Sequence, residues 1–342
     1  MIPSDFPTQQ AALGVRRLLL ICLALLCAAC AREANPPLRI GIVAKSLGNG
    51  FFNAVRKGAE QAAVELGGTR IIFTGPTTPT AEGQIDVINA LIAQHVDVIA
   101  VSANDYDALV PVLRRAQQRG VRVMSFDSAV APAGRRVHLA PSSDALVGRT
   151  CLRLAGAAMP RGQGRFVILS ATPTSTNQNA WIAAMRAALP DFPALELVTV
   201  VYGDDLADKS YRETVSLLQQ YPDLRVIVAP SSVAIVAAAK AVEDQGAVGR
   251  VFVTGLGLPS ELEGHVAAGS VRSFAIWNPL DLGYALTQIA VRMTRDGAGV
   301  GPDRSVSIGR LGSVTFDAQG SAPMAAPFIY DRDNIAQFAR IF

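Results

Sequence analysis

The chain has few of the residues and none of the short motifs on which the common enzyme classes depend. It contains no G-x-x-x-x-G-K-[ST] phosphate loop, no G-x-G-x-x-G turn after a strand and no G-x-S-x-G elbow. Its three histidines, His95, His138 and His265, are scattered without the spacing of metal ligands. No nucleophile stands in a pattern with a base. These absences predict a binding protein without a cofactor or a metal site, rather than an enzyme.

Cysteine is scarce in the part of the chain that is expected to fold. Three of the four cysteines, Cys22, Cys27 and Cys30, lie within the first 31 residues, which leaves Cys151 alone. A single cysteine can form neither an intrachain disulfide nor a paired-cysteine zinc site. Cys151 stands in the apolar helical run ALVGRTCLRLAGAAM, which predicts a buried structural thiol.

A large excess of charge is also lacking. The formal net charge is +3 over 342 residues, and 17% of the residues are charged whereas 50% are hydrophobic. Such a chain has neither the basic surface of a nucleic-acid-binding protein nor the composition of a disordered one. Its length suits about two domains of roughly 150 residues each.

The first 31 residues have the pattern of a targeting segment. Arg16 and Arg17 precede the apolar run LLLICLALLCAACA, which has 14 residues. A transmembrane helix needs about 20 apolar residues. A basic start, a short apolar stretch and small residues at its end predict a secretory signal peptide over residues 1–31. A buried N-terminal helix is the alternative.

Two ways of processing this signal remain open. The sequence Cys-Ala-Ala-Cys30 resembles a lipobox, in which Cys30 would be lipidated and would begin the mature chain, although Leu is usual where Cys27 stands. Ala29-Cys30-Ala31 also fits an A-x-A cleavage site, which would release a soluble protein. We expect the first outcome, a periplasmic protein anchored through a lipidated Cys30.

Short β-branched runs alternate with amphipathic helical patterns along the rest of the chain. The runs are RIGIVAK, RIIFTG, VDVIAVSA and VRVMSFD, followed by RFVILSA, LELVTVVYG, RVIVAP and RVFVTGLG. Continuous apolar runs bounded by turns are typical of parallel strands covered on both faces, and their alternation with helices predicts right-handed βαβ units. One such helix is predicted over residues 105–116, with Asn104 or Asp105 as its cap and Gly120 as its end.

The runs form two sets, which predicts an α/β protein of two doubly wound parallel-sheet lobes. RRVHLAPSS, VRSFAIWNP and the C-terminal tail would pass between the lobes and make a hinge of three crossings. We assign residues 38–138 and 278–305 to the N-terminal lobe, and residues 139–277 and 306–342 to the C-terminal lobe.

Polar and aromatic residues follow the predicted strands at their carboxyl ends, where open α/β sheets bind ligands. The first strand leads into Lys45-Ser-Leu-Gly-Asn-Gly-Phe51-Phe52, which combines a cation, a flexible turn and two aromatic rings. This balance suits a sugar, with hydroxyls on one face and C–H groups on the other, better than a phosphate. The ligand-binding residues that we expect are Lys45, Phe51, Phe52, Asn104, Asp127, Asn177, Gln178, Trp181, Pro230, Ser232, Trp277, Asn278 and Asp281.

Some of these residues have structural alternatives. Asn104 and Asp127 could each cap the segment that follows them. One of Phe51 and Phe52 is expected in the core, because neighbours at the start of a helix point in different directions. Trp181 could face either the cleft or the core.

Several separated motifs, in one order along the chain, carry a resemblance to a known family. They are KSLGNGFF, TGPTTPTAEGQIDVINALIAQ, SANDYDALVP, PTSTNQNAW, VYGDDLADKSYRE, VTGLGLPSE and FAIWNPLDLGY. Over residues 38–342 the chain resembles the rhamnose-binding proteins of bacterial ABC sugar importers. These are class I periplasmic binding proteins, close to the ribose-binding proteins and the autoinducer-2 receptors. The resemblance implies a hinged, monomeric receptor that captures a sugar outside the inner membrane and delivers it to a permease with its ATPase.

The autoinducer-2 receptors are the nearest alternative within that group. The residues that match their binding pattern are Lys45, Asp127, Gln178 and Pro230. Asn177 stands where that pattern has an aspartate, and Ser232 where it has an alanine. The departure favours rhamnose, with autoinducer-2 or another pentose or deoxysugar as the alternative. The methyl group of rhamnose would need an apolar wall, for which Leu47, Leu256 and Trp277 are candidates.

Three other roles can be compared with this prediction. The effector domain of a LacI-like repressor would share the fold, but it would carry a helix-turn-helix where this chain has a secretion signal. An enzyme that acts on a sugar would turn its ligand over. A receptor whose loaded form also signals to a chemoreceptor would have the same binding site.

Overall fold

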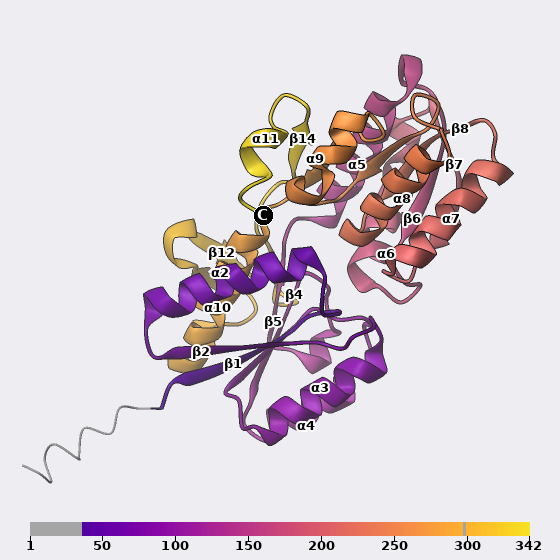
Figure 1. Ribbon diagram of the computed structural model, residues 1–342. Helices are drawn as coiled ribbons and strands as arrows, with labels where there is room; N and C mark the ends of the chain where they lie inside the picture. The colour runs from indigo at the N-terminus through magenta and orange to yellow at the C-terminus, as the bar shows by residue number, and fades with distance from the viewer. Residues whose placement is uncertain (1–35, 297–298) are drawn as a thin grey trace, which may run out of the picture. The chain divides into compact units, whose positions relative to one another are not determined.

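The computed structural model describes residues 36–296 and 299–342, and its folded unit spans Leu38–Phe342 (Figure 1). The predicted signal peptide, and Cys30 within it, lie outside the described residues. Each helix of the described part is too short or too polar to cross a membrane.

The first of two large sheets has six strands in the order β13-β5-β4-β3-β1-β2. All of its neighbouring strands run parallel. Its strands are β1 (Leu38–Val43), β2 (Thr69–Thr74), β3 (Val98–Val101), β4 (Arg122–Phe126), β5 (Val137–Ala140) and β13 (Ser321–Pro323). The helices on it are α2 (Gly50–Leu66), α3 (Ala81–Ala93), α4 (Val110–Gln118) and α10 (Pro279–Arg295). We call this sheet and its helices the first lobe.

Helices cover both faces of the first sheet, with α2 and α10 on one face and α3 and α4 on the other (Figure 1). Helices α2 and α10 cross closely because glycine lies at the contact on each of them. A Cβ on Gly58 would collide with the backbone of Leu280, and one on Gly283 with the backbone of Val55. This contact fixes α10, which arrives late in the sequence, against the first lobe.

The second large sheet has four parallel strands in the order β7-β6-β8-β9. Its strands are β6 (Gly164–Ser170), β7 (Leu195–Tyr202), β8 (Leu224–Ala229) and β9 (Phe252–Gly255). Its helices are α5 (Asp144–Ala158), α6 (Thr176–Ala188), α7 (Ala207–Gln220), α8 (Ser232–Asp244) and α9 (Pro259–Ala268). Helix α5 packs against α6, and α7 against α8. We call this sheet and its helices the second lobe.

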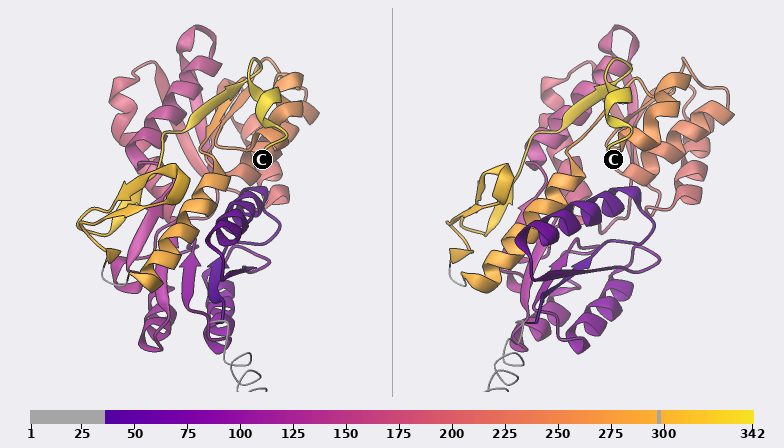
Figure 2. Two further views of the ribbon diagram at one scale, coloured as in Figure 1. Left: turned by 90° about the vertical axis from the view of Figure 1, so that its left-hand side faces the viewer. Right: turned by 60° about the vertical axis from the view of Figure 1, so that its left-hand side comes forward.

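Smaller elements complete the described fold. They are β10 (Ser273–Ile276), β11 (Ser305–Ser307), β12 (Ser313–Thr315), β14 (Phe328–Asp331) and α11 (Ile335–Phe338), with the 3-10 turns η1 (Pro132–Gly134), η2 (Pro160–Gly162), η3 (Leu189–Asp191) and η5 (Gly309–Leu311). Strand β10 pairs antiparallel with β14 and is bridged to the end of β9. Figure 2 shows the C-terminal segment, in yellow, passing from the β11–β12 hairpin beside α10 to β14 beside β10.

The predicted fold class is confirmed, since each lobe has a parallel sheet whose strands alternate with helices. The chain passes between the lobes after β5, after β10 and between β13 and β14. Each of the eight apolar runs predicted as a strand forms one.

Strand β13 differs from the predicted division, which gave residues 306–342 to the second lobe. Its residues Ser321–Pro323 pair in parallel with residues 138–140 of β5, at the edge of the first sheet. The strand has three residues and ends in a proline, which suits an edge strand because proline has no backbone N–H to donate to a further strand. A segment this short has no hydrophobic period that sequence analysis could detect.

Helix α4 begins later than predicted, at Val110, with Pro111 in its first turn. Asp105 does not cap it, because its Oδ1 accepts hydrogen bonds from the backbone N–H groups of Asp107 and Ala108. Aspartate side chains compete with helix formation in this way. Asn104 does not cap it either, and its side chain is used elsewhere.

The prediction of a buried structural thiol at Cys151 is confirmed. The residue is fully buried in α5 and has no disulfide partner among the described residues, and burial raises the pKa of its thiol to about 12. It therefore stays protonated at neutral pH and is unreactive.

Candidate functional site

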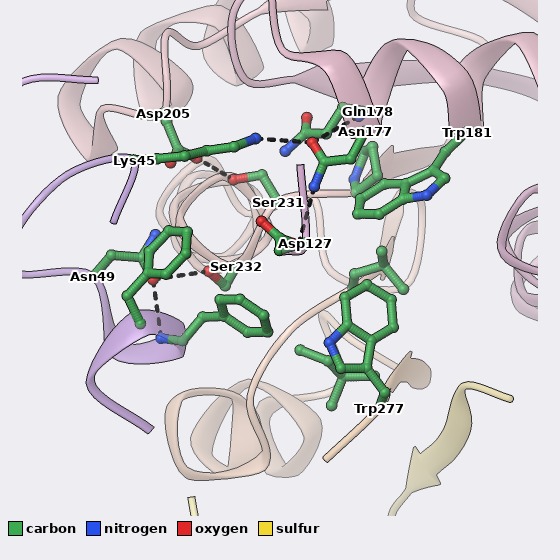
Figure 3. Close-up of a pocket in the computed structure, with 15 residues that line it drawn as sticks. Lys45, Asn49, Asp127, Asn177, Gln178, Trp181, Asp205, Ser231, Ser232 and Trp277 are labelled. Atoms are coloured by element: carbon green, nitrogen blue, oxygen red, sulfur yellow. Dashed lines mark hydrogen bonds between the residues drawn. The ribbon is translucent and has the colours of Figure 1, made fainter. Parts of the chain in front are cut away.

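The carboxyl ends of strands from both lobes line one cavity (Figure 3). We call it the sugar cavity, after the ligand predicted from the sequence. Its lining residues are Lys45, Asn49, Phe51, Phe52, Asp127, Asn177, Gln178, Trp181, Asp205, Pro230, Ser231, Ser232, Leu256, Ile276 and Trp277. It offers about 50 Å³ in which the centres of water-sized molecules fit. One water needs about 10–15 Å³ on this measure, so the space suits one compact ring.

Lys45 and Asn177 join the two lobes across this cavity. The Lys45 ammonium lies 2.8 Å from Asn177 Oδ1 and 2.8 Å from Ser175 Oγ, and it donates to both. Asn177 Nδ2 donates in turn to Asp127 Oδ1 at 3.1 Å. Lys45 and Asp127 follow strands of the first lobe, whereas Asn177 lies in the first turn of α6 in the second. The polar centre of the cavity is therefore a chain of hydrogen bonds between the lobes.

The carboxylates of the cavity come from strained backbone. Asp127 and Asp205 have φ values of 56° and 55°, a left-handed conformation that non-glycine residues rarely adopt. Asp204 beside Asp205 has a φ of 54°, so two such residues stand in succession. Strain of this kind gathers at binding sites, where the surrounding structure holds a side chain in a required position.

Hydrogen bonds orient both carboxylates, and each carboxylate still has free acceptor positions. Asp127 Oδ2 accepts from Ser102 Oγ at 2.7 Å, and Asp205 Oδ1 accepts from Ser231 Oγ at 2.6 Å. A carboxylate has about four acceptor positions. Each of these groups can therefore accept further hydrogen bonds from ligand hydroxyls.

Burial dominates the electrostatics of the site. Desolvation lowers the pKa of Lys45, and the nearby charges of Asp127 and Asp205 oppose that shift. Desolvation raises the pKa of Asp127, against the attraction of Lys45 and the hydrogen bonds from Ser102 and Asn177. One buried ammonium thus faces the buried carboxylate of Asp127 and the half-buried carboxylate of Asp205. In such surroundings each hydrogen bond from a hydroxyl to a charged group is strong.

Aromatic rings make the other wall of the cavity. The ring of Phe51 meets Phe52 edge to face at 5.2 Å and Trp277 at 6.1 Å. Trp181 and Trp277 lie 5.6 Å apart. All four side chains are buried, and all four also line the cavity. A position in the core or in the cleft was expected for Phe51, Phe52 and Trp181, and each of them has both. Their faces suit the C–H groups of a sugar ring.

Ten of the thirteen residues expected at the ligand are brought together at the sugar cavity. They are Lys45, Phe51, Phe52, Asp127, Asn177, Gln178, Trp181, Pro230, Ser232 and Trp277. Gln178 uses its Oε1 to accept from Ser170 Oγ and from the backbone N–H of Ala171. Its amide NH₂ group is left to face a ligand.

Asn104, Asn278 and Asp281, which were also expected at the ligand, do not line the sugar cavity. Asn104 donates from Nδ2 to the carbonyl oxygens of Lys45 and Thr80, and so holds the Lys45 loop from behind. Asn278 caps α10, accepting from the Leu280 N–H, and donates to Asp281 Oδ2 at 2.8 Å. Capping takes Asn278 out of the cavity, and Asp281 faces Asn278 and Arg310.

Five lining residues were not among the thirteen expected at the ligand: Asn49, Asp205, Ser231, Leu256 and Ile276. Of these, Leu256 was considered only as a candidate for the apolar wall, and Ser231 holds Asp205. Asn49 caps α2 by accepting from the Phe51 N–H, and its Oδ1 also lies 3.4 Å from Ser232 Oγ across the cavity. Its position in the Gly-Asn-Gly turn, directly after the first strand, could have identified Asn49 as a site residue. Asp205 belongs to the loop after β7, and Ile276 ends β10. Only the three-dimensional arrangement brings these two to the site.

Gln84 of α3 holds the strand ends of the first lobe together beneath the site. It is fully buried, and its Nε2 donates to the carbonyl oxygens of Ala44 and Ser102. Its Oε1 accepts from the backbone N–H of Asn104 at 2.9 Å. The loops that carry Lys45 and Asn104 are therefore pinned to one helix. Within residues 36–296 and 299–342, no group of three or more side chains has the arrangement of a metal site.

The sequence and the structure were compared with known proteins. The model of a family described as "Periplasmic binding protein domain" matches residues 40–298. A crystal structure of an ABC transporter solute binding protein from Clostridium phytofermentas, with bound L-rhamnose, is 34% identical. The likeness covers 90% of this chain and 99% of that one, with a TM-score of 0.84.

Two further relatives are more distant. The D-ribose/D-allose-binding protein of Pseudomonas aeruginosa is 26% identical over 225 residues, which cover 64% of this chain and 70% of the relative. LsrB from Clostridium saccharobutylicum, solved in complex with AI-2, is 20% identical, with a TM-score of 0.81 over 88% of this chain and 99% of that one. This last likeness shows the fold alone.

Proposed function

The chain belongs to the periplasmic binding protein domain family, and from this premise we propose that it binds L-rhamnose in the sugar cavity and delivers it to an inner-membrane permease with its ATPase. It is the substrate-binding component of a sugar ABC transporter. The prediction of binding rather than catalysis is confirmed by the family and by these relatives. The proposal includes a monomeric protein that does not bind nucleic acid.

The rhamnose-bound relative is the observation that carries the choice of ligand. It is 34% identical to this chain, which spans nearly all of it. The sugar cavity adds chemical support. Lys45 can donate to ring and hydroxyl oxygens, while Asp127 and Asp205 can accept from hydroxyls. The aromatic wall and Leu256 can enclose the C–H and methyl groups of a 6-deoxy sugar.

Autoinducer-2 remains the alternative ligand, because Lys45, Asp127, Gln178 and Pro230 fit that pattern as well. Asn177 favours rhamnose over it. The Asn177 amide has no charge, and only one of its two polar atoms is an acceptor. A carboxylate at this position would accept from more ligand hydroxyls.

Capture would proceed by closure of the two lobes around the hinge. The direct bonds from Asn177 to Lys45 and Asp127 lie across the cavity, where a sugar hydroxyl can replace them. A ligand that bridges these groups binds the closed arrangement better than an open one, and it shifts the population by that difference in affinity.

The discrimination between L-rhamnose and L-mannose tests this assignment. L-mannose differs by a hydroxyl on C6, which would meet the apolar wall of Leu256, Ile276 and Trp277. A buried hydroxyl without a partner costs about 1–3 kcal/mol. We therefore expect titration calorimetry to give an L-mannose affinity roughly 5- to 150-fold below that of L-rhamnose. Tighter binding of autoinducer-2 or D-ribose than of L-rhamnose in the same assay would overturn the proposal.

The family is periplasmic, and for this chain we propose an anchor at Cys30. The lipobox-like sequence before Cys30 supports a lipidated N-terminus, which would hold the receptor at the membrane near its permease. We expect mass spectrometry of the mature protein, expressed with its own signal, to find an acylated Cys30 as the first residue. A mature chain that begins unmodified at Arg32 would contradict the anchor.

A further inference from the structure

The start of α2 in the first lobe meets the start of α9 in the second lobe. A Cβ on Gly50, the first residue of α2, would collide with Glu261 Oε1 and would lie 3.1 Å from Leu258 Cδ1. Glu261 lies in the first turn of α9, and Leu258 directly precedes that helix. The two lobes therefore touch at this point, and the contact depends on the absence of a side chain at residue 50.

This contact lies outside the residues that close the sugar cavity. Asn49 and Ser232, one from each lobe, line both the sugar cavity and a groove outside it, so they separate the two spaces. We call this groove the outer groove. Gly50 and Glu261 line the outer groove but not the sugar cavity. A sugar in the cavity does not touch Glu261, so Glu261 can act on the sugar only through the closure of the lobes.

The Glu261 carboxylate lies at the positive ends of two helices, one from each lobe. It belongs to the first turn of α9, and it packs against the first residue of α2. The first N–H groups of a helix have no partner within the helix, and a negative charge near them is stabilising. When the lobes are closed, this charge serves both helix ends, whereas in an open receptor it serves α9 alone.

No cation accounts for the position of Glu261. Desolvation raises the pKa of its carboxyl, although part of the side chain stays exposed, and no neighbouring charge contributes to that shift. Arg212 and Lys240 also line the outer groove, and the ammonium of Lys240 is bonded to Asp244. A carboxylate that is partly removed from water needs compensation. The N-terminus of α2 is the neighbouring group that can supply it.

We propose that Glu261 is a latch of the closed receptor: a positioning residue that does not touch the sugar but holds the lobes closed over it through the N-terminus of α2. The inference rests on the proposed binding of a sugar in the sugar cavity and concerns the regulation of that site. The loaded, closed receptor gains the contact, and the open receptor lacks it, so the latch strengthens binding. It also slows release, because the contact has to break before the sugar leaves.

A double-mutant cycle on the full mature protein tests the latch, with binding of L-rhamnose measured by titration calorimetry. Glu261→Ala removes the carboxylate, and Gly50→Ala places a methyl group where the carboxylate lies. We expect each variant to weaken binding by roughly 2- to 5-fold, the usual effect of one charge at a helix N-terminus. The double variant should bind no more weakly than Glu261→Ala alone, because both substitutions remove the same contact.

The dissociation rate separates a latch from a role of Glu261 within α9 alone. Trp181 and Trp277 line the sugar cavity, so their fluorescence can report sugar release in a stopped-flow experiment. Glu261→Gln, which removes only the charge, should raise the dissociation rate by roughly 2- to 5-fold and leave the association rate unchanged. Glu263→Gln, an exposed residue of α9 outside the outer groove, is the matched control. Gly50→Ala should not lower the thermal unfolding temperature, because alanine favours a helix more than glycine does.

Three outcomes would decide against the proposals. Single variants that bind and release L-rhamnose like the wild type overturn the latch, and so do effects of Gly50→Ala and Glu261→Ala that multiply in the double variant. A wild type that binds D-ribose or autoinducer-2 but not L-rhamnose overturns the proposed function alone, and the same cycle with that sugar then decides the latch. A wild type that binds none of the three ligands overturns both.

Discussion

Replacing Asp127 by alanine is expected to weaken the binding of L-rhamnose by roughly 5- to 150-fold. The carboxylate is buried at the centre of the site and held by Ser102 and Asn177. Its loss removes an acceptor for sugar hydroxyls, and an unmade buried hydrogen bond costs about 1–3 kcal/mol. Lys45 would also lose a nearby opposite charge. Titration calorimetry with L-rhamnose measures the effect directly.

Two companion variants separate the loss of a ligand contact from general damage. Asp127→Asn keeps the shape of the side chain but removes its charge, so it should also weaken binding. Asp86→Asn removes an exposed carboxylate of α3 that does not line the sugar cavity, and it should leave the affinity unchanged. An Asp127→Ala protein that folds and binds L-rhamnose like the wild type would exclude Asp127 as a ligand group.

The main strands of both lobes were predictable because each is a continuous apolar run covered on both faces. The clearest example is β8, whose residues RVIVA are buried except at the first position. Strand β13 was not predictable, because a three-residue segment depends on its neighbour β5 rather than on its own sequence. The late start of α4 has a local cause, the turn that Asp105 makes with its own backbone.

The site was predictable where a residue type and a strand end coincide, as for Lys45 and Asp127. It was not predictable where the choice depends on which way a loop turns. Asn278 and Asn49 both cap helices, yet only Asn49 also faces the cavity. Asp205 lies at the site because Asp204 and Asp205 both have left-handed backbone conformations. No sequence pattern predicts two such residues in succession.

The double variant Lys45→Met, Asp127→Leu should be more stable than the wild type and should not bind sugar. Burial disfavours the charged form of both groups, lowering the pKa of Lys45 and raising that of Asp127. Replacing buried charges of opposite sign by apolar side chains of similar volume is often stabilising, by about 1–4 kcal/mol. Urea unfolding at neutral pH measures the change, and calorimetry the loss of binding.

The two single variants are compared with the double variant in the same unfolding experiment. Lys45→Met leaves Asp127 buried without its nearby cation, and Asp127→Leu leaves Lys45 without its nearby anion, so each should be less stable than the wild type. The pair Lys57→Met, Asp86→Leu, which changes exposed residues of α2 and α3, should show no such pattern. A double variant less stable than both singles would contradict the expectation.

The pH dependence of stability follows from the same burial. A raised pKa in the folded protein means that the carboxyl group binds its proton more tightly in the folded state than in the unfolded chain. The contribution of Asp127 to the free energy of unfolding therefore becomes more favourable as the pH falls through its raised pKa, and less favourable as the pH rises. The double variant lacks this contribution, so its advantage over the wild type should shrink on acidification. Sugar hydroxyls that bond to Lys45 and Asp127 would replace hydrogen bonds to water that these charged groups lose on burial.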